Sequence, residues 1–145
     1  RQACASFTQN SKYAAVRLET SLPTDKPCQI MASEMEIRLA VDNLIRNAAE
    51  SLLSGNCSQP LIRVQVTSTS DSIVIRVTDN GAKLTDTDIE RMKTPLSSSK
   101  SDGLGLGLSI VSGVAQSNGG KLILKAREKG GVIAELSFPK QACFP

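Results

Sequence analysis

Two pairs of segments in which apolar and polar residues alternate constrain the fold of this chain most. Residues 61–69 and 72–79 are rich in Val and Ile and meet at a polar turn around Ser70-Asp71. Residues 121–127 and 132–138 flank the pair Gly130-Gly131. Alternation with a period of two residues is typical of half-buried strands. Because both connections are short and rich in turn residues, the sequence predicts two β-hairpins.

Helical patterns separate the hairpins. From Ser33 to about Leu53, apolar residues recur every three or four positions, and Ser33 with Glu36 fits a capping box. A second helix is predicted from about Gly105 to Ser117. The remaining expected elements are a short helix near residues 86–92 and strands over residues 14–20 and 28–31.

The order of these elements predicts an α+β fold. Tight connections favour a mixed, largely antiparallel sheet of about five strands. About three helices would cover one face of it and complete a two-layer α/β sandwich. The 145 residues suit a single domain. We expect residues 1–13 to be a loosely packed lead-in or truncated linker and residues 14–145 to form the domain.

Composition removes several classes of function. The chain has no histidine, which excludes a Ser-His-Asp triad, a histidine general base and a histidine metal ligand. Aromatic residues make up only 3% and the basic residues are scattered, so we expect no nucleic-acid partner. No apolar run approaches the ~20 residues that a bilayer requires, so we expect no membrane contact by this domain. The four cysteines favour reduced thiols, with a contact between Cys4 and Cys143 left open.

Three motifs carry groups suited to phosphate chemistry. Asn43, Asn47 and Glu50 lie at helical spacing on the first long helix, and amide oxygens suit Mg²⁺. Asp79 ends a strand, and Gly81 lets the chain turn away, so its carboxylate can accept from an amino group such as that of adenine. Lys100 precedes the glycine run, and its ammonium can meet a terminal phosphate. The run itself begins a helix, whose free N–H groups can bind phosphate; it comprises Gly103, Leu104, Gly105, Leu106, Gly107 and Leu108.

Each motif has an ordinary alternative when taken alone. An Asn pair can simply face water on an amphipathic helix, Asp-Asn-Gly is a common turn, and a Ser-rich loop is usually solvated. Their order along the chain is more specific. The motifs are Asn-Leu-x-x-Asn-Ala, a strand followed by Asp-Asn-Gly, Ser-Lys-x-x-Gly-Leu-Gly-Leu-Gly-Leu, and Asn-Gly-Gly. In this order of motifs, the chain resembles the ATP-binding catalytic domain of sensor histidine kinases. That family belongs to the gyrase, heat-shock chaperone, histidine kinase and MutL superfamily.

The resemblance covers roughly residues 14–139 and implies a Bergerat-type ATP-binding fold. The segment from Asn43 to Ser51 is most similar to the oxygen, nitrogen and dicarboxylate sensors. By resemblance, Asn43 and Asn47 would be catalytic and hold Mg²⁺, with Lys100 as a third catalytic group. The implied ATP-binding residues are Asn43, Asn47, Glu50, Asp79, Gly81, Lys100, Gly103, Leu104, Gly105, Leu106, Gly107 and Leu108. Residues 83–102 match the mobile ATP lid, and Gly130 and Gly131 match a third glycine region.

The implied function is transfer of the ATP γ-phosphoryl group to a histidine. Since the chain has none, the acceptor would lie on a separate dimerisation domain, and a response regulator would receive the phosphate. The expected location is cytoplasmic, in a sensor that is either soluble or anchored in the inner membrane. Two departures stand out: Lys83 replaces a glycine of the Asp-x-Gly-x-Gly motif, and Met92 and Leu96 stand where lids usually carry phenylalanine.

Three other functions remain as alternatives. The same fold could be a degenerate, non-catalytic nucleotide-sensing module, which Lys83 favours. An anti-sigma-type serine kinase of the same superfamily would phosphorylate a serine. A dinucleotide-binding oxidoreductase is the least favoured, because Gly107 follows Gly105 too soon for that fingerprint and the run comes late in the chain.

Overall fold

The structure, a computed structural model, describes residues 1–23, 30–94 and 106–140. Five strands form one sheet, in which β1 pairs with β2 in parallel and all other neighbours are antiparallel. Both predicted hairpins and the mixed sheet are confirmed. Their spatial order is β1 (Arg17–Ser21), β2 (Leu61–Ser68), β3 (Ser72–Asp79), β5 (Val132–Pro139) and β4 (Lys121–Ala126).

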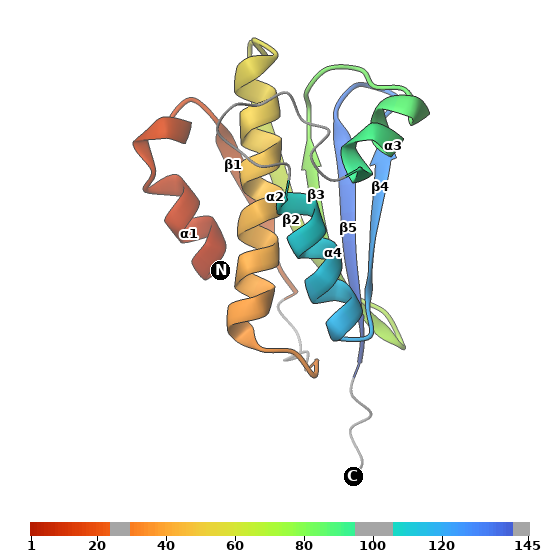
Figure 1. The fold of residues 1–145 in the computed structure, drawn as a ribbon. Helices are drawn as coiled ribbons and strands as arrows, with labels where there is room; N and C mark the ends of the chain where they lie inside the picture. Colours follow the sequence, from red (N-terminus) through yellow and green to blue (C-terminus); the bar gives the residue numbers. More distant parts are fainter. Residues whose placement is uncertain (24–29, 95–105, 141–145) are drawn as a thin grey trace.

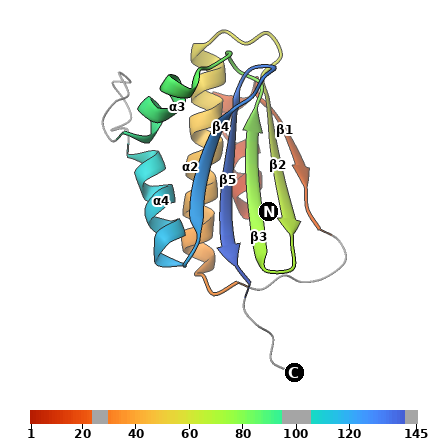
Figure 2. The same ribbon diagram turned by 90° about the vertical axis from the view of Figure 1, so that its right-hand side faces the viewer.

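The helices of the described residues lie on one face of this sheet, as the two views in Figures 1 and 2 show together. The other face of the sheet is uncovered in the described part of the chain. This is the predicted two-layer arrangement, with one more helix than the sequence indicated. The helices are α1 (Gln2–Thr8), α2 (Glu34–Ser54), α3 (Asp86–Lys93) and α4 (Gly107–Ser117), with a short 3₁₀ helix, η1 (Ser11–Tyr13).

The hydrophobic core lies between the two layers. Alternate residues of β3 and β5 are buried toward the helices, while their neighbours in sequence are only partly buried. On α2, Ile45 and Leu52 are almost fully buried against this face. Asp79 falls at a buried position of β3, in phase with Ile75 and Val77. The alternation that forms the core therefore carries a carboxylate into the interior at the end of the strand.

Residues 1–13 differ from the loose packing expected of them. They form α1 and η1, whose apolar residues belong to the main hydrophobic core. Phe7 and Tyr13 stack with ring centroids 4.9 Å apart, and both are buried. Arg38 of α2 also donates to Gln2 and Ser6 of α1. The N-terminal residues are therefore packed onto the domain through this aromatic pair.

Two other expectations were wrong in detail. Ile30 and Met31 are not in a strand, and residues 28 and 29 lie outside the described residues. Ser33 is the N-cap of α2, but its side chain makes no capping hydrogen bond. A complete capping box stands instead at the start of α3, between Thr85 and Asp88. The remaining helices and strands agree with the sequence analysis to within a few residues.

In residues 1–23, 30–94 and 106–140, none of the helices combines the length and apolar character that crossing a membrane requires.

Candidate nucleotide-binding site

The carboxylate of Asp79 is the centre of the candidate site. The residue is 5% exposed, and both of its side-chain oxygens accept backbone hydrogen bonds. Oδ1 accepts from the N–H of Gly81 at 2.9 Å, and Oδ2 accepts from the N–H of Val132 at 3.3 Å. Because each carboxylate oxygen can accept more than one hydrogen bond, both keep capacity for a ligand's amino group.

The turn between β4 and β5 closes over the end of β3. Gly131 donates its N–H to the carbonyl of Ala82 at 2.9 Å. A Cβ on Gly131 would lie 2.1 Å from the backbone oxygen of Asp79, and one on Gly130 would lie 2.6 Å from that of Gly81. Both glycines also have positive φ, at +94° and +102°. Only residues without side chains allow this turn to pack against Asp79.

Two polar side chains fix the backbone around Asp79. Arg127 donates from Nη1 to the carbonyl of Asp79 at 2.7 Å and to that of Gly130 at 3.3 Å. Asn80 accepts from the N–H of Leu61 and donates to the carbonyl of Gln59, both at 2.8 Å. Asn80 therefore joins β3 to the start of β2, and its side chain is committed to structure.

Burial raises the pKa of the Asp79 carboxyl above its ordinary value, because the charged form loses solvation. The N–H groups of Gly81 and Val132 and the positive charge of Arg127 lower the pKa and oppose this effect. A buried carboxylate whose pKa is perturbed in this way is a candidate functional position.

The second part of the site lies where α2 meets the beginning of α4. A Cβ on Gly107 would lie 3.2 Å from Oδ1 of Asn43 and 3.2 Å from the side-chain amide of Asn47. Asn43 is 9% exposed and donates Nδ2 to the carbonyl of Leu39 at 2.8 Å. That bond leaves its Oδ1 directed toward Gly107. In the residues described, no side chain caps α4, and its first residue, Gly107, lies beside the two asparagines. The first N–H groups of a helix have no partner within the helix.

One α2 side chain links the two parts. Leu52 is 1% exposed and follows Asn47 by five residues on α2. Its Cδ2 lies 3.5 Å from the position of a Cβ on Gly81. The Asp79 carboxylate and the two asparagines therefore lie along one stretch of α2, between Asn43 and Leu52.

The other predicted residues divide into three groups. Glu50, on the turn of α2 after Asn47, forms an ion pair with Lys12 at 3.7 Å. Leu106 and Leu108 flank Gly107, with Leu108 partly buried against the core and Leu106 42% exposed. The rest lie outside the described residues: Lys100, Gly103, Leu104 and Gly105.

Sequence reasoning missed Arg127 and the N–H of Val132. Both lie about fifty residues from Asp79 and act on or through backbone groups, so no local pattern marks them. Lys83 is exposed, and Asn56 is the only residue other than glycine with positive φ in the described part. The lysine therefore adopts an ordinary backbone conformation.

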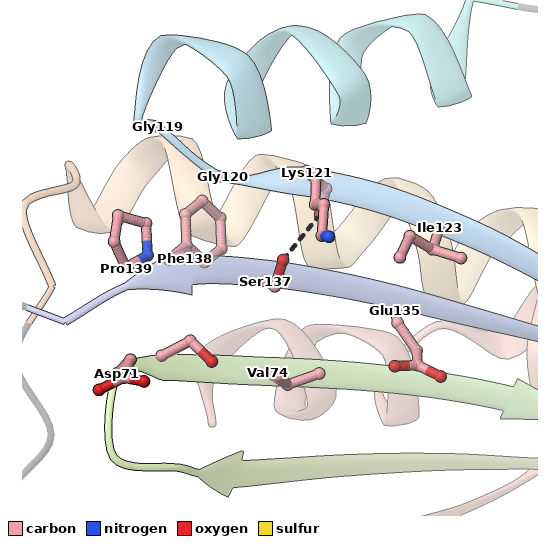
Figure 3. A pocket seen from close by; sticks show the side chains of 11 residues that line it. Asp71, Val74, Gly119, Gly120, Lys121, Ile123, Glu135, Ser137, Phe138 and Pro139 are labelled. Carbon is pink, nitrogen blue, oxygen red and sulfur yellow. Dashed lines mark hydrogen bonds between the residues drawn. The ribbon is translucent and has the colours of Figure 1, made fainter.

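A separate hollow lies on the uncovered face of the sheet, near the opposite end of β3 (Figure 3). Val74, Ile123 and Ser137 line it, with Lys121 and Glu135 at its sides. It contains neither Asp79 nor the α2 asparagines, and the whole sheet separates it from α2. We therefore do not assign the nucleotide to it.

Comparisons with known proteins agree with this geometry. Residues 32–142 match the family of histidine kinase-, DNA gyrase B- and HSP90-like ATPases. Sporulation kinase B of Bacillus subtilis (strain 168) is 25% identical over 89% of this chain. The C4-dicarboxylate transport sensor protein DctB of Rhizobium meliloti (strain 1021) is 31% identical over 83% of it. Full-length ShkA in complex with AMPPNP shares the fold over 100% of this chain, with a TM-score of 0.80 at 18% identity.

The chain belongs to this ATPase family, as the ATP-binding catalytic domain found in sensor histidine kinases. It spans 29% of sporulation kinase B, 18% of DctB and 30% of ShkA, so it corresponds to one part of longer proteins.

Proposed function

We propose that this domain binds ATP with Mg²⁺ and transfers the γ-phosphoryl group to a histidine on a separate acceptor domain. The observation that carries the proposal is that Asn43 and Asn47 meet Gly107 at the start of α4. Asp79 lies buried at the end of β3, next to Gly81, which Leu52 of α2 approaches. Asp79 would accept from the adenine amino group. The free N–H groups of α4 would bind the phosphates, as helix N-termini do.

The side-chain amides of Asn43 and Asn47, next to Gly107, fit a magnesium ion. Asn43 Oδ1 is directed toward Gly107, and the amide of Asn47 lies at the same distance. Neutral amide oxygens suit Mg²⁺, which is bound by few protein groups and by phosphate oxygens. Asn43 and Asn47 would hold the ion, and when bound it supplies charge neutralisation for the phosphates. Lys100, outside the described residues, would add a further positive charge near the terminal phosphate.

Neutral amides at both positions favour transfer over hydrolysis. By its place in the motif, Asn43 corresponds to a glutamate that activates water in hydrolysing relatives. An amide cannot remove a proton from water at neutral pH, so no general base stands at this position. The domain would instead position the phosphate and leave the nucleophile to the acceptor histidine.

This chain has a surface suited to docking of the acceptor domain, next to Asn43, Asn47 and Gly107. Leu106, the N-cap of α4, and Ile110, on its first turn, are 42% and 38% exposed. Leu39, one turn before Asn43 on α2, is 46% exposed. Exposed leucine and isoleucine next to a phosphate site fit an apolar partner surface that brings an imidazole close. We propose that the dimerisation and phosphoacceptor domain docks here, that a response regulator receives the phosphate, and that the domain works in the cytoplasm.

Phosphotransfer is tested with labelled ATP and Mg²⁺. In the full-length parent protein we expect an acid-labile phosphohistidine outside residues 1–145. The isolated domain should bind ATP but acquire no such label. A phosphoserine, which is acid-stable, would instead indicate the anti-sigma-type activity. ATP binding without any transfer in the full-length protein would indicate a nucleotide sensor.

The adenine contact is tested by calorimetry on Asp79→Asn. The amide presents an N–H₂ group where a carboxylate oxygen accepted, so a buried partner is left mispaired. We expect ATP binding to weaken by about 1–3 kcal/mol. Asp71→Asn, at the opposite end of β3, is the matched control and should bind as the unchanged protein does. Equal ATP affinity in a folded Asp79→Asn variant would remove Asp79 from the site.

A further inference from the structure

Arg127 occupies an unusual position in the site, because it binds the backbone of the adenine-binding residue rather than its carboxylate. A single nitrogen, Nη1, reaches the carbonyl oxygens of both Asp79 and Gly130. Asp79 ends β3, whereas Gly130 belongs to the turn between β4 and β5. Arg127 therefore connects its own turn to the end of β3, 48 residues earlier in the chain, at the point where the carboxylate is buried.

The position of the turn determines the surroundings of the carboxylate. Val132, directly after the two glycines, donates its N–H to Oδ2 of Asp79. The turn adopts a conformation that only glycine takes readily, and the close approach of Gly131 leaves no space for adjustment. A guanidinium that binds both sides of this contact can hold the turn against the strand. Without it, the N–H of Val132 and the carboxylate would lose their fixed alignment.

Arg127 also supplies charge. The neighbours of Asp79 on β2 and α2 are apolar, with Ile62 opposite it in the sheet and Leu52 beside Gly81. Arg127 is the charged group whose field acts on the carboxyl, and it favours the ionised form against the effect of burial. An ionised carboxylate only accepts hydrogen bonds, which suits the amino group of adenine. A protonated one could donate to the oxygen that guanine carries at the same position.

We propose that Arg127 is a positioning residue of the nucleotide site, which holds the β4–β5 turn against Asp79 and keeps that carboxylate an acceptor, so that the pocket selects adenine over guanine. This inference rests on the proposed function, since it assumes that Asp79 contacts the purine. It assigns to the hairpin turn a role in nucleotide selectivity, in addition to its packing.

The test compares Arg127→Gln and Arg127→Lys with Lys125→Gln by calorimetry with ATP and GTP across pH 4.5–8. Lys125 lies on the same hairpin but pairs with Glu135 on the uncovered face, so its loss is a matched control. For Arg127→Gln we expect ATP affinity to fall about three- to tenfold at neutral pH. As the pH is lowered, Arg127→Gln should lose ATP binding at a higher pH than the unchanged protein does. The ratio of its affinity for ATP to its affinity for GTP should also be smaller. Lys125→Gln should match the unchanged protein throughout.

Arg127→Lys separates geometry from charge. Lysine keeps the positive charge, but its side chain is shorter and lacks the planar guanidinium. We therefore expect Arg127→Lys to bind ATP more weakly and to lose ATP binding in acid at the same pH as the unchanged protein. This variant also decides the matter if Arg127→Gln does not fold. The inference would be overturned if the folded variants bound ATP as tightly as the unchanged protein and lost ATP binding at the same pH. Failure of the unchanged protein to bind ATP would overturn the proposed function itself.

Discussion

At the scale of single residues, the candidate site depends on the carboxylate of Asp79, which is buried although burial disfavours its charged form. The sequence predicted that Asp79 ends a strand, and β3 does end there. The burial of Asp79 follows from the period of two, which puts every other residue of β3 on the buried face. Arg127 could not be predicted. It acts through two main-chain carbonyls, and a carbonyl has the same chemistry at every position of a chain.

Burial of Asp79 makes a prediction about stability as a function of pH. Because its pKa is raised in the folded state, the folded protein binds the proton more readily than the unfolded one. This group therefore lowers stability as pH rises from the ordinary carboxyl pKa through the folded pKa. Asn does not titrate. The free energy of unfolding of Asp79→Asn minus that of the unchanged protein should thus increase as pH rises. This difference should become constant above the folded pKa of Asp79.

Urea denaturation at a series of pH values from 4 to 8 measures this difference. A difference between Asp79→Asn and the unchanged protein that stays constant over this range would mean that burial does not destabilise the carboxylate.

At the scale of elements, α4 contains two glycines with opposite surroundings. A Cβ on Gly107 would be 3.2 Å from the side chains of both Asn43 and Asn47, whereas one on Gly113 would meet nothing within 4 Å. The sequence predicted the helix and the phosphate role of its start. It could not show which glycine is required, because that depends on how closely α2 approaches.

Alanine substitutions at these glycines should have different effects. Gly113→Ala should raise the free energy of unfolding by about 0.5–1 kcal/mol, since alanine costs less backbone entropy within a helix. It should leave ATP affinity unchanged. Gly107→Ala should weaken ATP binding by about 1 kcal/mol or more, because the added methyl crowds both amides. Denaturation and calorimetry on the two variants provide the measurements, and equal ATP affinity in both would contradict the close approach of α2 and α4.

At the scale of the whole molecule, the first thirteen residues were the element least visible in the sequence. Their polar composition concealed Phe7 and Tyr13, which lie six residues apart and come together only because a turn separates α1 from η1. The five-stranded sheet and its one-sided helices were predictable, since the hairpins and the long amphipathic helix have strong periodicity. The parallel pairing of β1 with β2 requires knowledge of where α2 crosses over, which no local pattern gives.

Phe7→Ala tests whether this N-terminal region belongs to the cooperative unit. Phe7 is 8% exposed and stacks on Tyr13. We expect its truncation to lower the free energy of unfolding by about 3 kcal/mol, as for other buried aromatic residues. Thr8→Ala, at an exposed position next to it, should change stability by less than about 0.5 kcal/mol. Two separate unfolding transitions, or no change for Phe7→Ala, would show that α1 is an independent appendage.

The donor to Oδ2 of Asp79 lies 53 residues along the chain from its acceptor. A chain that has formed β3 but not yet the second hairpin therefore lacks this hydrogen bond to the Asp79 carboxylate, however native its local structure. Under the proposed function, in which Asp79 binds the purine, nucleotide recognises this protein only late in folding, after these distant segments have come together. ATP should consequently slow the unfolding reaction and leave the refolding rate nearly unchanged.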